Sequence, residues 1–221
     1  MLVYRTKFTD LLKTRFNKSY LRRLGQVLLG LGLTLLVACS EQKLTKLDSS
    51  DVILAFGDSL TQGVGVNKPY SYPSVLSRLS GLNVVNAGIS GETTEEGLQR
   101  LASVIEQHNP GLLILIEGGN DILRNKPHAK AKSNLAKMIE IAKSRAIEVV
   151  LIGVPEKNLF SQSAPFYSEL ANEYDLVFDR ELIGRLMRSP SKKSDSVHFN
   201  KAGYQAMAEG IYDLLVDNGA L

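Results

Sequence analysis

Short apolar runs alternate with helix-like segments from Val52 to the end of the chain, and this alternation constrains the fold more than any other feature. The apolar runs that we expect to form strands cover residues 52–56, 83–86, 112–116, 148–153 and 176–178. Segments with a helical pattern lie between or after them, at residues 72–79, 95–107, 131–145 and 204–216. Several runs are apolar throughout, which is typical of strands covered on both faces of a parallel sheet. We therefore predict the α/β class: a three-layer α/β/α sandwich around a central parallel sheet of about five strands.

The first expected strand runs directly into the sequence Gly57-Asp58-Ser59-Leu60-Thr61. Ligands of parallel sheets bind outside the carboxyl ends of the strands, so a serine at this turn would expose its hydroxyl group to a crevice. The segment differs from the GxSxG turn of α/β-hydrolases, because Thr61 occupies the position of the second glycine. A serine that only caps a helix is the ordinary alternative at such a turn.

Asp195 and His198 lie in a polar stretch before the last expected helix. Their spacing lets the carboxylate reach Nδ1 of the imidazole, which leaves Nε2 free to accept a proton from a hydroxyl group. Without such an acid, a histidine beside a helix is more often a surface or capping residue, and we interpret His108 and His128 in this way. Ser59, His198 and Asp195 are therefore our candidates for nucleophilic catalysis.

Glycine-rich turns follow the second and third expected strands. Gly91, within residues 86–94, offers an unhindered backbone N–H, and Asn120, directly after Gly119, offers a side-chain amide. Acyl transfer needs such donors at the oxygen atom that becomes negatively charged. Plain glycine turns, the second with Asp121 as a cap, are the alternative.

Four segments in this order resemble the blocks of the SGNH (GDSL-type) hydrolase family, and the match covers most of residues 52–210. They are GDSLTQG at 57–63, NAGISGETT at 86–94, GGND at 118–121 and DSVH at 195–198. The chain resembles most closely the bacterial periplasmic branch that includes arylesterases and the multifunctional thioesterase/lysophospholipase. The resemblance implies a flavodoxin-like fold. Phe199 departs from the family pattern, which often has proline after the histidine, and we expect this to alter loop rigidity rather than the chemistry.

The resemblance also implies a role for each matching residue. Ser59 would be the nucleophile, His198 the general base and Asp195 the acid that orients it. The backbone N–H groups of Ser59 and Gly91 and the side chain of Asn120 would form the oxyanion hole. Neither a metal ion nor an organic cofactor is implied.

The expected activity is the hydrolysis of aryl or medium-chain acyl esters through an acyl-enzyme, with lysophospholipids and thioesters as further substrate classes. An acyl group has to lie against apolar surface, which residues after the third and fourth strands could supply. The acyl-binding residues that we expect are Ile122, Leu123, Val154, Pro155, Leu159 and Phe160. Phe166 and Tyr167 are further candidates, although core packing is the more frequent role of such side chains.

Two other functions are compatible with the same segments. A hydrolase of this fold could remove acetyl groups from a cell-envelope polysaccharide. A non-catalytic, flavodoxin-like binding lipoprotein is an alternative of another class, because the Ser/Thr/Gly-rich first turn also resembles a flavin-phosphate site. A phosphate site would not need Asp195 and His198, and a colourless purified protein would argue against a flavin.

The first 38 residues resemble a lipoprotein signal peptide. Basic residues precede residues 27–39, VLLGLGLTLLVAC, a run of thirteen residues without a charge. This run is shorter than the roughly 20 residues that span a bilayer. It ends in a small residue before Cys39, as in a bacterial lipobox. A buried helix in which the cysteine packs as an apolar side chain is the alternative.

We therefore expect residues 1–38 to be removed, Cys39 to be lipidated, residues 39–50 to form a flexible tether and residues 51–221 to form the hydrolase domain. The protein would then be lipid-anchored in the bacterial cell envelope, and Ser40 resembles a signal for the periplasmic face of the outer membrane. Its partners would be a membrane and a small ester or lipid substrate.

The distribution of charge supports this division. The whole chain has 26 basic and 23 acidic residues, a formal charge of +3. Residues 1–38 hold seven of the basic residues and one of the acidic residues, so 19 and 22 remain and the formal charge becomes −3. No basic cluster with interleaved aromatic residues follows residue 50, so we expect no nucleic-acid partner. The single cysteine excludes an intrachain disulfide and a cysteine-based zinc cluster.

Overall fold

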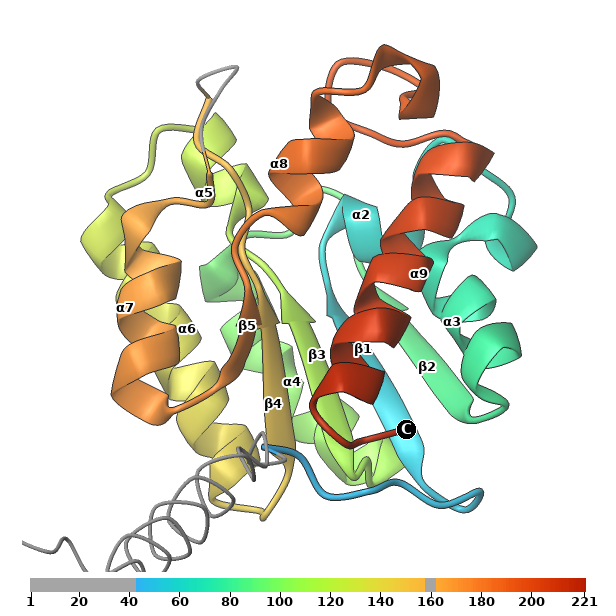
Figure 1. Ribbon diagram of the computed structural model, residues 1–221. Coiled ribbons are helices and arrows are strands. Elements are labelled where there is room, and N and C mark those ends of the chain that lie inside the picture. The colour runs from blue at the N-terminus through green and yellow to red at the C-terminus, as the bar shows by residue number, and fades with distance from the viewer. Residues whose placement is uncertain (1–42, 158–161) are drawn as a thin grey trace, which may run out of the picture. The chain divides into compact units, whose positions relative to one another are not determined.

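Five parallel strands form the centre of the part of the chain that the computed structural model describes, residues 43–157 and 162–221 (Figure 1). The strands are β1 (Val52–Gly57), β2 (Asn83–Gly88), β3 (Leu112–Ile116), β4 (Glu148–Ile152) and β5 (Val177–Asp179). Their order across the sheet is β2-β1-β3-β4-β5, and every neighbouring pair is parallel. The predicted α/β class and the parallel five-stranded sheet are confirmed.

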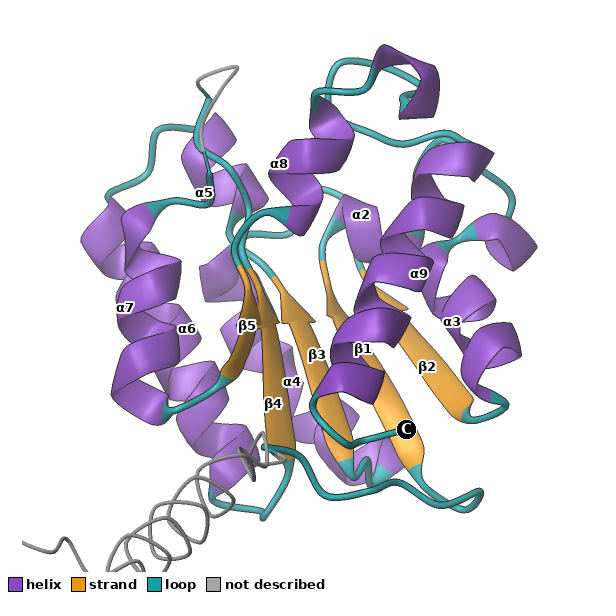
Figure 2. Ribbon diagram, viewed as in Figure 1, coloured by secondary structure: helices purple, strands orange, loops and turns teal. Residues whose placement is uncertain are grey.

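Helices connect successive strands and cover both faces of the sheet (Figure 2). On one face lie α3 (Tyr72–Ser80) and α9 (Lys201–Asp217), and on the other lie α4 (Thr94–His108), α6 (His128–Lys143) and α7 (Pro165–Tyr174). The shorter helices near the carboxyl ends of the strands are α2 (Ser59–Gln62), α5 (Gly119–Leu123) and α8 (Leu182–Met187). Single 3-10 turns cover Lys68–Tyr70 and Pro190–Lys192.

The apolar core fills the space between the sheet and the helices. Every residue of β3 is buried, whereas β2, at the edge of the sheet, is only partly buried and carries Asn83 and Asn86. The predicted inward face of α6, with Leu135 and Ile139, is buried as expected. This core fixes the carboxyl ends of the strands, from which the candidate functional residues extend.

The strand order creates a crevice at the carboxyl edge of the sheet. From β1 the chain moves outward to β2, and it then crosses back to β3 on the other side of β1. The connections that leave β1 and β3 therefore diverge to opposite faces, which opens a crevice between their carboxyl ends. The Ser59 turn follows β1 and the Asn120 turn follows β3, so both begin at this crevice.

The prediction of a flexible tether over residues 39–50 is wrong for the residues of that segment that pack against the domain. Leu44 is buried, and its N–H donates to the carbonyl of Asn218 at 3.1 Å. The N–H of Leu47 donates to the carbonyl of Ala220 at 2.9 Å, and the N–H and hydroxyl of Thr45 donate to the carboxylate of Glu148. Because the segment is mostly polar, the sequence did not show that Leu44 and Leu47 pack against the domain. The acceptors of their hydrogen bonds lie near the C-terminus, far away in the chain.

The predicted signal peptide over residues 1–38 and the lipidation site Cys39 lie outside the described residues. Within the described ranges, no helix has both the length and the apolar character needed to cross a membrane. Residues 44–51 lead into the amino end of β1, whereas Ser59 follows its carboxyl end (Figure 1). The chain therefore enters the domain at the amino ends of the strands, and the crevice lies at their carboxyl ends.

Candidate active site

Ser59 is the first residue of α2, at a tight turn between β1 and this helix. Asp58 is the N-cap, and its Oδ1 accepts a hydrogen bond from the N–H of Leu60 at 3.0 Å. Gly57 is required at the end of β1, because a Cβ there would lie 2.2 Å from the carbonyl oxygen of Ile116. The N–H of Ser59 has no partner within its own helix, since the first amides of a helix lack intrahelical acceptors.

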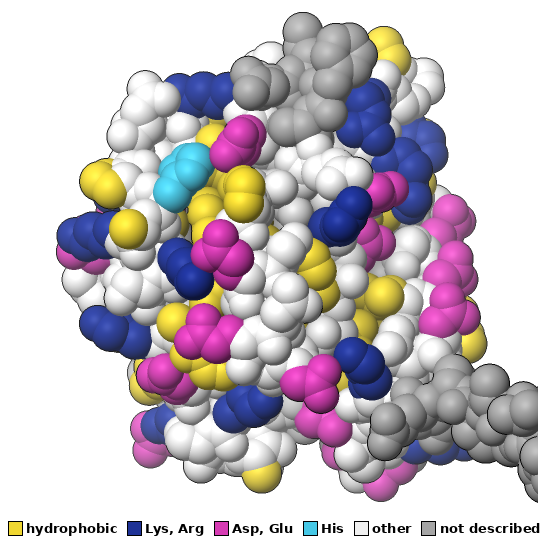
Figure 3. Space-filling model, turned by 60° about the vertical axis from the view of Figure 1, so that its left-hand side comes forward, with side chains coloured by type: hydrophobic (Ala, Val, Ile, Leu, Met, Phe, Trp, Pro, Cys, Tyr) yellow, Lys and Arg dark blue, Asp and Glu magenta, His cyan; other side chains and the backbone are white. Residues whose placement is uncertain are grey.

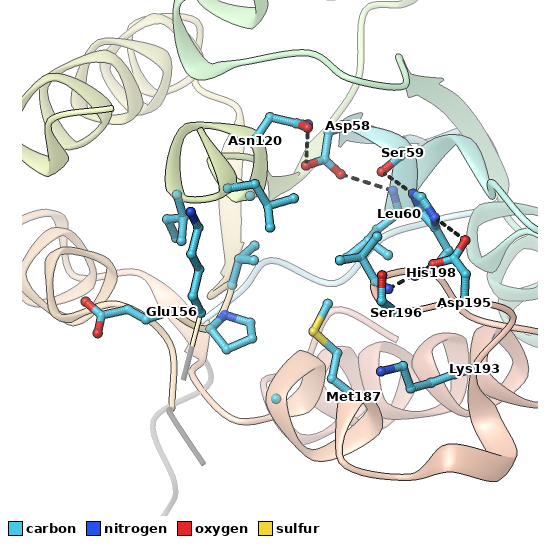
Figure 4. A pocket seen from close by; sticks show the side chains of 18 of the residues that line it. Asp58, Ser59, Leu60, Asn120, Glu156, Met187, Lys193, Asp195, Ser196 and His198 are labelled. Carbon is cyan, nitrogen blue, oxygen red and sulfur yellow. Dashed lines mark hydrogen bonds and ion pairs between the residues drawn. The ribbon is translucent and has the colours of Figure 1, made fainter. Parts of the chain in front are cut away.

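The side chains of Ser59, His198 and Asp195 form a continuous hydrogen-bonded chain (Figure 4). His198 Nε2 lies 3.0 Å from Ser59 Oγ, and His198 Nδ1 lies 2.8 Å from Asp195 Oδ2. The structure therefore brings together the three residues that were predicted for nucleophilic catalysis. In this arrangement the carboxylate holds the Nδ1–H tautomer, so Nε2 faces the serine hydroxyl as an acceptor.

Backbone hydrogen bonds keep Asp195 ionised. Its Oδ1 accepts from the N–H groups of Val197 and His198, both at 2.8 Å. The hydrogen bond from Val197, and then the one from His198, lower the pKa of Asp195 to about 2. A carboxylate that stays charged at all ordinary pH values can stabilise an imidazolium beside it.

Packing against α9 fixes the loop that carries His198. Phe199 is fully buried, and its ring lies edge-on to Tyr204 with the centroids 5.7 Å apart. The side chain of Asn200 caps α9 by accepting from the N–H of Gly203 at 3.1 Å, and its amide group donates to the carbonyl of Ser191 at 2.8 Å. Phe199, at the position where the family often has proline, thus holds the loop through burial of its ring.

The loop between β2 and α4 carries Gly91, which has a φ of +82°. Three side chains from other elements hold this loop. Gln62 Oε1 accepts from the N–H of Ser90 at 2.6 Å, Arg124 Nη2 donates to the carbonyl of Gly91 at 2.8 Å, and Asn120 Nδ2 donates to the carbonyl of Glu92 at 2.8 Å. The sequence pattern gave no sign of Gln62 and Arg124, because both act across long separations in the chain.

Both hydrogen atoms of the Asn120 amide are engaged. Besides its bond to the Glu92 carbonyl, Nδ2 donates to Asp58 Oδ2 at 3.2 Å. An amide nitrogen has two hydrogen atoms, so donation to a third acceptor requires sharing or exchange of one of these bonds. The longer bond, to Asp58, joins the predicted oxyanion residue directly to the neighbour of Ser59.

Asp58 combines deep burial with proximity to His198. Burial raises its pKa to about 6, the nearby carboxyl groups of Glu92 and Asp121 add to this effect, and the Leu60 N–H and His198 oppose it. The carboxyl group can therefore change its protonation state in the range in which histidine also titrates. This residue was absent from the candidates because an aspartate before a turn serine normally acts as a simple cap.

A cleft of about 1010 Å³ opens in front of Ser59 and His198. Of the predicted acyl-binding residues, Ile122, Leu123, Val154 and Pro155 line it, whereas Leu159 and Phe160 lie outside the described residues. Among the cleft residues that the sequence did not indicate, five come from α8 and the loop that follows it: Gly184, Met187, Arg188, Pro190 and Lys193. Lys193 and Met187 lie on the side of the cleft across from Asn120 (Figure 4).

Phe166 and Tyr167 are core residues and do not line the cleft. Both are buried in α7, and their rings lie 4.4 Å apart between centroids. The hydroxyl of Tyr167 donates to the carbonyl of Glu117 at 2.6 Å, so the residue supports the end of β3 from the side of α7.

On the face that includes α7, basic and acidic side chains are interspersed (Figure 3).

Known proteins resemble the chain over the region that holds these residues. Residues 55–206 match the sequence profile of the GDSL-like Lipase/Acylhydrolase family. An arylesterase of Vibrio mimicus is 37% identical over 111 residues, which are 48% of this chain and 56% of the relative. The Thioesterase 1/protease 1/lysophospholipase L1 of Escherichia coli K12 is 27% identical over 169 residues, which are 73% of this chain and 81% of the relative.

A solved structure resembles the fold as well. AlinE4, described as an SGNH-hydrolase family esterase, superimposes on this chain with a TM-score of 0.60 at 33% identity. The superposition covers 78% of this chain and 98% of AlinE4. The chain thus spans little more than half of the Vibrio relative and nearly all of AlinE4.

Proposed function

The chain belongs to the GDSL-like lipase/acylhydrolase family, and we propose that it is a serine hydrolase of carboxylic esters that acts through Ser59, His198 and Asp195. The observation that carries the proposal is the unbroken series of hydrogen bonds from Asp195 through His198 to Ser59 at the wall of the cleft. A helix-capping serine would need no histidine at 3.0 Å, and a phosphate site would need neither the histidine nor its acid.

The proposed reaction proceeds in two steps. In the first, Ser59 Oγ bonds to the ester carbonyl carbon while its proton passes to His198 Nε2; the imidazolium then gives that proton to the leaving alcohol as the C–O bond breaks. In the second, a water molecule attacks the acyl-enzyme and loses a proton to Nε2, and Ser59 Oγ leaves with that proton. Asp195 stabilises the imidazolium in both steps.

The oxyanion of each tetrahedral intermediate would lie between the N–H groups of Ser59 and Gly91 and the amide of Asn120. Since Asn120 Nδ2 already donates to Glu92 and Asp58, the longer bond to Asp58 is the one that we propose to be shared with the oxyanion. The bond to Glu92 would keep the amide oriented while charge develops on the substrate.

The cleft suits an acyl or aryl group larger than acetate. Its volume and its apolar lining by Ile122, Leu123, Val154 and Pro155 favour aryl and medium-chain acyl esters over an acetylated polysaccharide. Arg188 and Lys193 at the same cleft would also accept a substrate with an anionic group, such as a lysophospholipid or an acyl thioester of coenzyme A. The names of the V. mimicus and E. coli relatives fit both classes.

We further propose that residues 1–38 are a signal peptide and that lipidated Cys39 holds the domain in the cell envelope. Because residues 44–51 pack against the amino edge of the sheet, only a few residues remain between the anchor and the domain. The cleft opens at the carboxyl ends of the strands, away from residues 44–51. Loss of radiolabelled palmitate incorporation in the Cys39→Ala variant tests the anchor.

The activity is tested with a panel of p-nitrophenyl esters of increasing acyl length, together with acyl-coenzyme A, lysophospholipid and an acetylated glycan. We expect the highest kcat/KM for a medium-chain or aryl ester and no turnover by Ser59→Ala. Hydrolysis of acetylated glycan alone would favour the deacetylase, and absence of turnover on every substrate would favour a binding protein.

A further inference from the structure

Four acidic side chains at or near the candidate site are buried: Asp58, which also lines the cleft, Glu92, Glu117 and Asp121. Hydrogen-bond donors satisfy three of them. The N–H and hydroxyl of Thr94 donate to Asp121 at 2.8 and 2.9 Å, and Leu60 and Asn120 donate to Asp58. Both carboxylate oxygens of Glu92 accept from the guanidinium of Arg100, Oε1 from Nε at 2.6 Å and Oε2 from Nη2.

Glu117 differs from the other three. It is fully buried at the end of β3, and its Oε2 accepts from the N–H of the next residue, Gly118, at 3.1 Å. Its Oε1 has no hydrogen-bond donor among the described residues, and a side-chain hydrogen bond with Glu92 contributes to raising the pKa of its carboxyl group. Two buried carboxyl groups in such contact cannot both be ionised, so they share a proton.

Charge balance assigns this proton to Glu117. Both oxygens of Glu92 accept hydrogen bonds from the Arg100 guanidinium, whereas no cation contacts Glu117 within the described part of the chain. Burial, with the nearby charges of Asp58 and Glu92, raises the pKa of Glu117 well above its ordinary value. As a neutral acid, Glu117 can donate its proton in a hydrogen bond to Glu92, which gives its orphaned oxygen a partner.

Glu92 connects this pair to the candidate oxyanion residues. It directly follows Gly91, and its backbone carbonyl accepts from Asn120 Nδ2 at 2.8 Å. The same Arg100 that holds its side chain donates to the carbonyl of Ala87 at 2.8 Å and lies 3.9 Å from the ring centroid of Phe56. The position of Glu92 is thus tied to the ends of β1 and β2, and any shift of its side chain would be transmitted to Gly91 and Asn120.

We propose that Glu117 is a positioning residue that acts as a neutral carboxylic acid: it donates a hydrogen bond to Glu92 and so fixes the loop that bears Gly91 and the carbonyl that orients Asn120. This inference rests on the proposed ester hydrolysis and extends it. Ionisation of Glu117 would place a second negative charge against Glu92, with one guanidinium to balance both. Repulsion would then move Glu92 away and misplace the oxyanion donors.

The carboxyl groups around Glu117 favour its neutral form, whereas the N–H of Gly118, which donates to Oε2, favours the ionised form. Asp58 faces it from the β1–α2 turn and Glu92 from the loop before α4, whereas Asp121, from α5, acts on Asp58. Tyr167, from α7, donates to the Glu117 carbonyl. The Arg100 guanidinium, from α4, reaches it only through Glu92. The loss of activity on ionisation of Glu117 is therefore expected on the alkaline side of the pH profile.

Two variants separate a neutral acid from a merely structural residue. Glu117→Gln keeps the shape and a donor but cannot ionise, and Glu117→Leu keeps the volume without a donor. We expect Glu117→Gln to retain kcat within about twofold at neutral pH and to lose the alkaline decline of the wild type. We expect Glu117→Leu to lower kcat about 10- to 100-fold with little change in KM, because the oxyanion donors are displaced. Glu106→Gln, at an exposed position of α4, is the matched control and should keep the wild-type pH profile.

A measurement that does not depend on activity accompanies the kinetics. Infrared difference spectroscopy of the wild type should show the carbonyl stretch of a neutral carboxylic acid at neutral pH, and Glu117→Gln should lack it. A missing signal, an unchanged alkaline decline in Glu117→Gln, or equal loss of kcat in Glu117→Gln and Glu117→Leu would overturn the proposal. Failure of the proposed function is distinct, since it would appear as absence of ester turnover by the wild type or as turnover that persists in Ser59→Ala.

Discussion

His198 Nε2 lies 3.0 Å from Ser59 Oγ although the two residues are 139 positions apart in the chain. Ser59 is held at the end of β1 by the α2 turn, and His198 by the loop that packs Phe199 against α9. Their contact therefore depends on the packing of the first strand and the last helix around the same core.

Removal of the Asn120 side chain should affect the rate of the chemical step rather than substrate binding. We expect Asn120→Ala to lower kcat about 10²- to 10³-fold with KM nearly unchanged, because an oxyanion donor acts mainly in the transition state. Steady-state kinetics with a p-nitrophenyl ester measure both parameters. A rise in KM at constant kcat would instead assign Asn120 to ground-state binding.

Asp58 should make the folded state less stable as the pH rises. Burial raises its pKa in the folded protein to about 6, from an ordinary value of 3.8, so the folded state binds the proton more tightly than the unfolded state. Its favourable contribution is complete below the unfolded pKa and is lost as the pH rises through about 6. The Tm of Asp58→Asn should therefore rise relative to that of the wild type as the pH increases from 3.8 to about 6. A difference that stays constant with pH would contradict the assignment.

Leu123 tests whether the cleft binds the acyl or aryl group. It lines the cleft and is 46% exposed, so a charged replacement there should not disturb the core. We expect Leu123→Asp to lower kcat/KM about tenfold for medium-chain esters and little for acetate, which corresponds to the loss of one leucine contact. Leu79→Asp, at a similarly exposed position of α3, is the control and should leave the chain-length profile unchanged. An equal loss for acetate and longer esters would place acyl binding elsewhere.

The segment before β1 should contribute to stability and not to catalysis. Leu44 is 7% exposed and lies in a segment held by hydrogen bonds to the C-terminal residues. We expect Leu44→Ala to lower the free energy of unfolding by about 2–3 kcal/mol at unchanged kcat. The exposed neighbour Lys43 provides the control, since Lys43→Ala should be neutral in denaturant unfolding. An equally stable Leu44→Ala variant would show that the segment does not support the domain.

The sequence predicted the strands well because buried parallel strands have a local signature. β3, Leu112–Ile116, is apolar at every position and was placed at its observed bounds. The helix α7, Pro165–Tyr174, was missed, and its inward residues Phe166 and Tyr167 were considered for the cleft instead. Short helices such as α5 have too few residues to show a helical period.

The candidate residues were predictable where a short motif contains the chemistry, as in the spacing of Asp195 and His198. The residues that hold them were not. Arg100 and Glu117 are charged or ionisable side chains that the sequence would place on the surface, and their burial depends on partners from other strands and helices. The docking of Leu44 depends on the carbonyl of Asn218, at the far end of the chain. Such long-range partners leave no local pattern.

We propose above that Ser59 is a nucleophile activated by His198, and chemical labelling tests this most directly. A fluorophosphonate probe phosphonylates an activated serine, and mass spectrometry of the intact protein and of its peptides shows how many groups are added and where. We expect one added group on Ser59 in the wild type, none in Ser59→Ala, and labelling slowed on the order of 10⁴-fold in His198→Ala. Equal labelling of the wild type and Ser59→Ala, or a modified peptide that lacks residue 59, would contradict it.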